Sequence, residues 1–154
     1  LVIAGRNERL KEQLEQLAGE RPNLRVVGFV NDVATYLAAA DVVVGKTGPA
    51  TVYETLAVGR PLFAPNTFGM AENKLLAMLE RNDLGGYTPV EQLPGVVAEL
   101  RANPERLDEI KAKTAALDFP GMAERIARYI SHYAQERTPA REVCGEGVGS
   151  LHRA

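Results

Sequence analysis

Residues 45–54, with the sequence Gly-Lys-Thr-Gly-Pro-Ala-Thr-Val-Tyr-Glu, combine residue types that suit the binding of an anion. The segment follows an apolar run at residues 42–44 and is expected to open a helix, because Pro49 suits the first helical position, where its missing N–H costs no hydrogen bond. Gly48 lets a ligand approach the bare backbone closely. The N–H groups of the first turn and the positive end of the helix dipole are typical of a phosphate site.

Glu54 lies one turn beyond Thr51 on the same predicted helix. A carboxylate repels a phosphate, but its two acceptor oxygens suit a vicinal diol such as a ribose. The phosphate site and the acid together indicate a nucleotide site. The alternative is that Thr47 caps the helix and Glu54 faces solvent, and the spacing alone leaves both interpretations open.

The bulk composition is that of one globular domain. The chain has 154 residues, of which 45% are hydrophobic and 25% charged. A formal net charge of −2 gives no basic field for nucleic acid, and no apolar run reaches the roughly 18 residues of a membrane span. The single cysteine, Cys144, excludes an internal disulfide and favours a reducing compartment. His132 and His152 stand outside every motif, so we expect no metal.

Short apolar runs alternate with helical patterns over most of the chain. This alternation, with short connections, predicts an α/β fold: a doubly wound parallel sheet covered on both faces, with extra helices at the carboxyl-terminal end. Ligands of such sheets bind beyond the carboxyl ends of the strands. The predicted strands are 1–4, 24–30, 41–45, 60–64 and a weak one at 86–88; the predicted helices are 8–19, 32–40, 49–58, 71–81, 90–102, 104–116 and 121–136.

The two ends of the chain differ in character. Residues 1–5 have the pattern of a buried strand without an initiating methionine, so we expect an excerpt of a longer chain with material missing upstream. Residues 1–136 are predicted to form the domain, and residues 137–154, which are rich in glycine, a flexible tail.

The loops after the first two predicted strands offer further candidates. Arg6 would lie at the carboxyl edge, able to meet a phosphate or a base, or would be a solvated arginine at a helix start. Phe29 and Val30 would flank a flat ring while their backbone groups bind its edge, or would be core residues. Asp32 or Asn31 is expected to be the N-cap of the next helix.

The loop at residues 65–73 is long and polar for a connection inside a compact domain, which favours a ligand-binding role. Glu72 and Asn73 could bind sugar hydroxyls. Equally, Thr67 and Glu72 could be ordinary helix-start residues.

These motifs together resemble the carboxyl-terminal domain of GT-B glycosyltransferases. The most similar branch contains the monogalactosyldiacylglycerol synthases, the bacterial diacylglycerol glucosyltransferases and the peptidoglycan GlcNAc transferase MurG. The resemblance covers residues 1 to about 135. It rests on Gly28-Phe29-Val30, on residues 40–44, on the run from Lys46 to Glu54, on Gly59-Arg60-Pro61, and on Pro65 and Asn73.

The resemblance implies a Rossmann-like half of a GT-B fold that holds a UDP-sugar without a nucleotide-bound metal or other cofactor. It implies that Glu54 binds the ribose and that backbone groups at Val30, beside Phe29, bind the uracil. The residues that the resemblance implies at the diphosphate are Thr47, Gly48, Pro49, Ala50 and Thr51. Arg6 is added to the nucleotide site because it would lie at the carboxyl edge of the sheet. The residues implied at the donor sugar are Met70, Glu72 and Asn73.

Two departures separate this chain from the family pattern. Gly69 and Met70 stand where the family usually has a Gln-Gln or Gln-Glu pair that grips the sugar, unless the loop is shifted so that Glu72 takes part. The strand and Gly-rich loop that open the family's domain are absent from the sequence, as is the amino-terminal domain that supplies the catalytic base and binds the acceptor.

We therefore expect the donor-binding domain of an enzyme, a UDP-sugar-dependent hexosyltransferase acting on a lipid or lipid-linked acceptor. The fragment alone is expected to be inactive, and the enzyme to be cytoplasmic and peripheral on the inner face of the membrane. The alternatives are a non-catalytic doubly wound nucleotide-binding or regulatory module and a UDP-sugar 2-epimerase-like enzyme. The catalytic residues are unknown from sequence.

Overall fold

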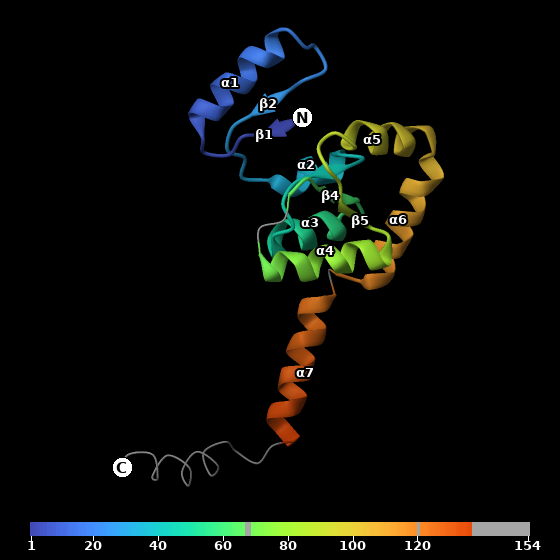
Figure 1. Cartoon of the computed structure of the whole chain (residues 1–154). Coiled ribbons are helices and arrows are strands. Elements are labelled where there is room, and N and C mark those ends of the chain that lie inside the picture. Colours follow the sequence, from blue (N-terminus) through green and yellow to red (C-terminus); the bar gives the residue numbers. More distant parts are fainter. Residues whose placement is uncertain (67–68, 120, 137–154) are drawn as a thin grey trace, which may run out of the picture.

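The computed structural model describes residues 1–66, 69–119 and 121–136. Parallel strands alternate with helices, which confirms the predicted α/β class, and Figure 1 shows the arrangement. The elements in chain order are β1 (Val2–Ile3), α1 (Glu8–Gly19), β2 (Val26–Val27), α2 (Val33–Ala39), β3 (Val43–Val44), α3 (Pro49–Ala57), β4 (Leu62–Ala64), α4 (Met70–Asn82), β5 (Gly85–Tyr87), α5 (Leu93–Ala102), α6 (Pro104–Leu117) and α7 (Met122–Glu136).

The strands form two separate parallel sheets rather than the one sheet expected from sequence. One sheet has the order β1-β2, and the other has the order β3-β4-β5. In the first, Val2 aligns with Val26; in the second, Val43 aligns with Leu62 and Leu62 with Gly85. The predicted parallel pairing is confirmed, and among the described residues the strands fall into these two hydrogen-bonded groups.

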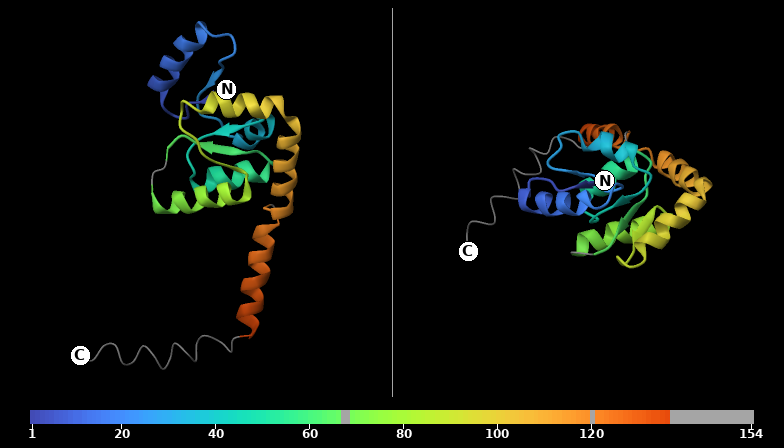
Figure 2. Two further views of the ribbon diagram at one scale, coloured as in Figure 1. Left: turned by 45° about the vertical axis from the view of Figure 1, so that its right-hand side comes forward. Right: turned by 90° about the horizontal axis from the view of Figure 1, so that it is seen from above.

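Helices cover both faces of the larger sheet. In Figure 1, α3 and α4 lie below this sheet and α5 lies above it, and the turned view on the left of Figure 2 shows the same layers. Helix α2 packs against α3, whereas α1 packs against β2 of the smaller sheet. This division of helices between two faces is what a doubly wound fold requires.

The core lies between α3, the larger sheet, α4 and α6. On α4, Leu76 and Leu79 are buried and Leu75 packs against the core. The fully buried cluster consists of Val52, Leu56, Leu62, Leu79, Leu84 and Ile110. Burial of such side chains is the main stabilising contribution to this part of the fold.

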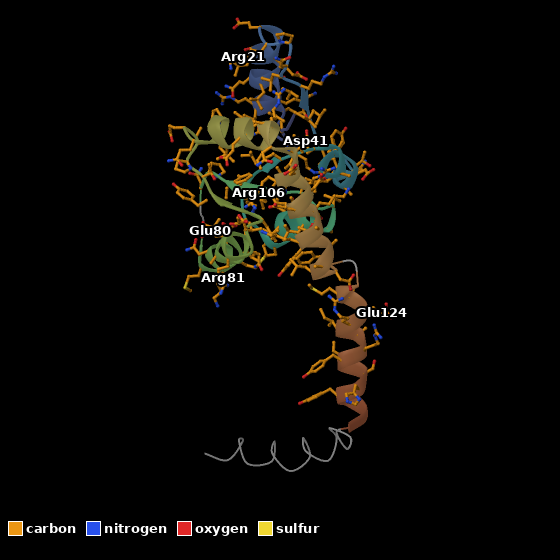
Figure 3. All side chains as sticks on the ribbon, turned by 90° about the vertical axis from the view of Figure 1, so that its right-hand side faces the viewer. Arg21, Asp41, Glu80, Arg81, Arg106 and Glu124 are labelled. Atoms are coloured by element: carbon orange, nitrogen blue, oxygen red, sulfur yellow. The ribbon has the colours of Figure 1, made fainter. Side chains whose placement is uncertain are left out.

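The turn between α4 and β5 depends on two special positions. Asp83 ends α4 in a left-handed conformation, and its carboxylate pairs with Lys113 at 2.9 Å and with Arg106, both on α6. Arg106 is labelled in Figure 3. At Gly85 an added Cβ would lie 1.9 Å from the carbonyl oxygen of Leu62, so only glycine lets β5 approach β4.

Helix α7 extends away from the rest of the domain, as Figure 1 and the left view of Figure 2 show. Arg125 anchors its first turn to Asp118. Its exposed apolar residues are Ile126, Tyr129, Ile130 and Tyr133. Among the helices described, none is long and apolar enough to cross a membrane. The predicted tail at residues 137–154 lies outside the described residues.

Candidate functional site

Helix α3 begins without a side-chain cap. Gly48 is its N-cap, with an extended backbone (φ −67°, ψ 147°), and Pro49 takes the first helical position as predicted. The first hydrogen bond within the helix runs from the N–H of Val52 to the carbonyl of Gly48 at 3.0 Å. The N–H groups of Ala50 and Thr51 precede that bond, so they are the donors that this helix end offers to a ligand.

Thr47 does not cap this helix, so the capping interpretation offered by the sequence was wrong. The Thr47 side chain is fully buried, and its hydroxyl donates to the backbone carbonyl of Glu72 at 3.2 Å. This bond ties the start of α3 to the start of α4. Thr47 therefore positions the helix end, and its buried hydroxyl does not face solvent.

Lys46 places a positive charge beside the same helix end. Its stem covers Gly48, because an added Cβ on that glycine would lie 3.3 Å from the Lys46 Cε. Its ammonium lies 4.0 Å from the Glu72 carboxylate, and its side chain remains 65% exposed. Lys46 was quoted in the motif but was absent from the predicted site residues. The sequence does hold a signal for Lys46. It is a cation two residues before Gly48, a glycine that cannot cap the first turn of the helix with a side chain.

Gly48 itself is buried, so a ligand would not reach its backbone directly in this arrangement. Pro49 and Ala50 are exposed and Thr51 is half-buried. An anion at this helix end would therefore meet the first turn beyond Gly48, with the Lys46 side chain next to it.

Glu54 is exposed on α3, one turn after Thr51. Within the part of the chain that the structure describes, its carboxylate makes no hydrogen bond or ion pair. The oxygens of Glu54 are thus available to a ligand. Its assignment to a ribose stays a prediction, as does the solvent-facing alternative.

The loops after β1 and β2 meet through an aromatic contact. The Arg6 guanidinium lies 3.8 Å from the centre of the Phe29 ring, and Phe29 is 51% exposed. A guanidinium on a half-exposed ring is a flat surface with a positive charge, which suits a planar ring or an anionic group. Val30 beside it is half-buried.

Asp32 has the structural role that the sequence favoured. It is the N-cap of α2 and accepts hydrogen bonds from the Thr35 hydroxyl at 2.5 Å and from the Thr35 N–H at 3.1 Å. These two bonds hold the pKa of the Asp32 carboxyl below its ordinary value. Asn31, the other candidate cap, is exposed.

The start of α4 lies beside the start of α3. The helix begins at Met70, one residue earlier than predicted, with Gly69 as N-cap. Glu72 is a first-turn acid of α4 and pairs with Lys46, whereas its binding of sugar hydroxyls stays a prediction. Met70 is 85% exposed and Asn73 is exposed. Thr67 lies outside the described residues.

The structure therefore gathers several predicted site residues, together with Lys46, into two groups. One is Arg6 with Phe29, at the ends of β1 and β2; the other is formed by the starts of α3 and α4, where Lys46, Thr47 and Glu72 interact. Both groups follow the carboxyl ends of parallel strands, where ligands of such sheets bind. No cluster of His, Cys, Asp and Glu able to hold a metal occurs among the described residues.

Comparisons with known proteins agree with this arrangement. The family model described as the glycosyltransferase family 28 C-terminal domain matches residues 1–126. A UDP-N-acetylglucosamine–N-acetylmuramyl-(pentapeptide) pyrophosphoryl-undecaprenol N-acetylglucosamine transferase from Bacteroides fragilis is 31% identical over 126 residues, which cover 77% of this chain and 33% of that protein.

The names of two further relatives include diacylglycerol. A processive diacylglycerol beta-glucosyltransferase from Bacillus licheniformis is 30% identical, covering 82% of this chain and 33% of that protein. Monogalactosyldiacylglycerol synthase 3 from Arabidopsis thaliana is 27% identical, covering 89% of this chain and 30% of that protein. The chain thus spans about a third of the length of these relatives.

A solved structure shows the same fold. The glycotransferase of kitacinnamycin superposes with a TM-score of 0.52 at 22% identity, covering 70% of this chain and 30% of that one. The predicted resemblance is confirmed by the family match, and the predicted Rossmann-like half of a GT-B fold is confirmed by this neighbour together with the parallel sheets. The chain belongs to the family of glycosyltransferase family 28 C-terminal domains.

Proposed function

We propose that this domain binds the UDP-sugar donor of a glycosyltransferase that acts on a lipid or lipid-linked acceptor. The observation that carries the proposal is the uncapped amino end of α3 with the Lys46 ammonium beside it. The relatives support the class of reaction: the names of two of them specify a diacylglycerol product or acceptor, and that of a third specifies UDP-N-acetylglucosamine.

The diphosphate would rest at the amino end of α3. The N–H groups of Ala50 and Thr51 would donate to its oxygens, and Lys46 would supply a positive charge. These groups can neutralise the departing diphosphate without a metal, so we propose metal-independent binding. The measurement is UDP affinity with Mg²⁺ and with a chelator, and equal values are expected.

The nucleoside would extend from the diphosphate toward Glu54 and the loop of Phe29 and Val30. The exposed Glu54 carboxylate would accept hydrogen bonds from both ribose hydroxyls. The sugar would face the start of α4, where Met70, Glu72 and Asn73 lie. Because Met70 stands in place of a polar residue, the hydrogen bonds to the sugar would come from Glu72 and Asn73.

The reaction would be displacement at the anomeric carbon, with UDP as the leaving group. The acceptor site and the general base would come from a part of the protein beyond this domain, because the chain covers only about a third of its relatives. The isolated domain should bind the donor and should not turn it over. Association with a membrane surface is proposed from the lipid acceptors named for the relatives.

The first experiment is calorimetric titration of the domain with UDP. The Glu54→Gln variant should weaken UDP binding about tenfold or more, because hydrogen bonds donated to a charged acceptor contribute about 1.5–3 kcal/mol. Glu99→Gln, which changes an exposed acid on α5, is the matched control and should bind as the parent does.

Titrations with UDP, UDP-glucose, UDP-galactose and UDP-N-acetylglucosamine then separate the alternatives. Binding of one UDP-sugar more tightly than UDP identifies the donor. Absence of binding for all four ligands would refute donor binding and leave the non-catalytic module. Unchanged affinity of Glu54→Gln would remove Glu54 from the site.

A further inference from the structure

Glu72 is an acid that lies largely out of solvent at the start of α4. Its side chain is 17% exposed, whereas that of its partner Lys46 is 65% exposed. Its backbone carbonyl accepts the hydrogen bond of the buried Thr47 hydroxyl at 3.2 Å. Residues that lead into α3 therefore contact both the carboxylate and the main chain of Glu72.

The carboxylate of Glu72 lies close to the amino end of α3. The Lys46 Nζ is 4.0 Å from a Glu72 carboxylate oxygen, and it is 3.6 Å from the position that a Cβ on Gly48 would take. One ammonium group thus separates this acid from the N-cap of α3. Glu72 is also a first-turn residue of α4, whose N-cap Gly69 offers no side-chain hydrogen bond.

These contacts create an electrostatic balance at the two helix starts. The amino end of each helix carries about half a positive charge, and Lys46 adds a full one. The Glu72 carboxylate offsets about half of this sum. Glu72 is therefore the protein's own counter-ion at the place where an anion would bind. An anion there is attracted by both helix ends and by Lys46, and it is repelled by Glu72.

The two nucleotides of the proposed reaction differ in charge at this place. In a UDP-sugar the β-phosphate is esterified to the sugar, so it carries one negative charge. In UDP the β-phosphate is terminal and carries about −1.5 to −2 at pH 7. The sugar hydroxyls can donate hydrogen bonds to a carboxylate, whereas the ionised oxygens of a terminal phosphate can only accept them.

We propose that Glu72 makes this site prefer the nucleotide-sugar over the free nucleoside diphosphate, so that the donor is retained and the product is released. The Glu72 carboxylate would accept hydrogen bonds from the sugar and would repel the terminal phosphate of UDP. The exposed Lys46 side chain would extend to the phosphate oxygens when the donor binds. Glu72 would then exchange Lys46 for the sugar hydroxyls.

This inference rests on the proposed function, because it requires a nucleoside diphosphate at the amino end of α3. It goes beyond that function by assigning the choice between donor and product to the charge of one residue. The contact of Glu72 with Lys46 and its low exposure distinguish it from the exposed Met70 and Asn73 at the same helix start.

Calorimetric titration of the 154-residue chain with UDP, UDP-glucose, UDP-galactose and UDP-N-acetylglucosamine tests the proposal. The quantity compared is the ratio of the dissociation constant of UDP to that of the UDP-sugar bound most tightly. Glu72→Gln keeps the length of the side chain and removes its charge. It should tighten UDP binding and lower this ratio about tenfold, as expected for the loss of one like-charge contact.

Two controls exclude other causes. Glu99→Gln removes an exposed acid of α5 and should leave the ratio unchanged. Uridine has no phosphate, so Glu72→Gln should not change its affinity. An equal fall of the ratio in Glu99→Gln would show a general effect of net charge, and an equal gain in affinity for uridine and UDP would show a changed fold. Either result would overturn the proposal.

The exchange of partners is tested in the Lys46→Met background. In the parent, Glu72→Gln removes both the repulsion of UDP and the ion pair that binding would break. With Lys46→Met that ion pair is already absent, so adding Glu72→Gln should give a gain in UDP affinity about threefold smaller than in the parent. An equal or larger gain would overturn the exchange of Lys46 between Glu72 and the phosphate.

The outcomes separate this inference from the proposed function. If no ligand binds the parent or Glu72→Gln, donor binding is refuted and the inference falls with it. If UDP and a UDP-sugar bind, and Glu72→Gln leaves their ratio unchanged, donor binding stands and discrimination by Glu72 is overturned. A parent that binds UDP more tightly than every UDP-sugar would also overturn it.

Discussion

Lys46 is the residue whose role was least evident from the sequence. A lysine in a loop is usually a solvated charge, and only the fold shows that its stem covers Gly48 and that its ammonium lies beside the start of α3. Its partner Glu72 is 26 positions away in the chain, so the contact could not be derived from local spacing. By contrast, Pro49 at the first helical position was predictable, because proline has a strong preference there.

The Lys46 side chain can be tested separately from the helix end. Lys46→Met keeps the stem over Gly48 and removes the charge, so UDP affinity should fall about three- to tenfold while affinity for uridine stays unchanged. Lys74→Met, an exposed lysine on α4, is the control. Equal losses for UDP and uridine in calorimetry would contradict a role at the diphosphate.

At the scale of elements, the boundaries were predicted well where caps and periodicity are strong. Helix α1 covers the predicted residues 8–19, and α3 ends one residue before the prediction. Strands β1 to β4 are shorter than predicted, since apolar runs continue into the turns that flank them, whereas β5 has the predicted length and begins one residue earlier. Helix α5 begins at Leu93 instead of residue 90, because residues 90–92 form a turn closed by the N–H of Gln92 on the Pro89 carbonyl.

Gly85 gives a prediction about the larger sheet. Gly85→Ala puts a Cβ into the backbone of β4 at a positive φ of 126°, so the free energy of unfolding should fall by about 3 kcal/mol or more. Gly95→Ala on α5 meets nothing within 4 Å and should change it by no more than about 1 kcal/mol. Urea denaturation of both variants makes the comparison, and equal midpoints would contradict the packing of β5 on β4.

The Asp83 ion pairs make the link between α4 and α6 depend on pH. Hydrogen bonds from Lys113 and then Arg106 hold the pKa of Asp83 below its ordinary value of 3.8. Their contribution is therefore present above that value and is lost as the pH falls through the lowered pKa.

Asp83→Asn keeps a residue that tolerates the left-handed conformation and removes the charge. At pH 7 it should lower the free energy of unfolding by less than about 1 kcal/mol, because the pairs are exposed and screened by salt. The difference from the parent should shrink near pH 3. Thermal denaturation at both pH values is the measurement, and a difference that grows on acidification would contradict this assignment.

At the scale of the whole molecule, the sequence predicted the order of strands and helices but not the division into two sheets. Apolar periodicity identifies a strand, but it carries no information on which strand pairs with which. The two sheets and the exposed Ile3 and Val44 appear only in the structure. The two groups of site residues lie at the ends of strands from different sheets.

The central claim is that a uridine diphosphate binds at the amino end of α3, and the most direct measurement is an NMR titration of the ¹⁵N-labelled domain with UDP. We expect saturable shifts that are largest at the amides of Ala50 and Thr51, with smaller shifts near Phe29. Saturable binding that leaves the Ala50 and Thr51 amides unmoved, or no binding at all, would contradict it.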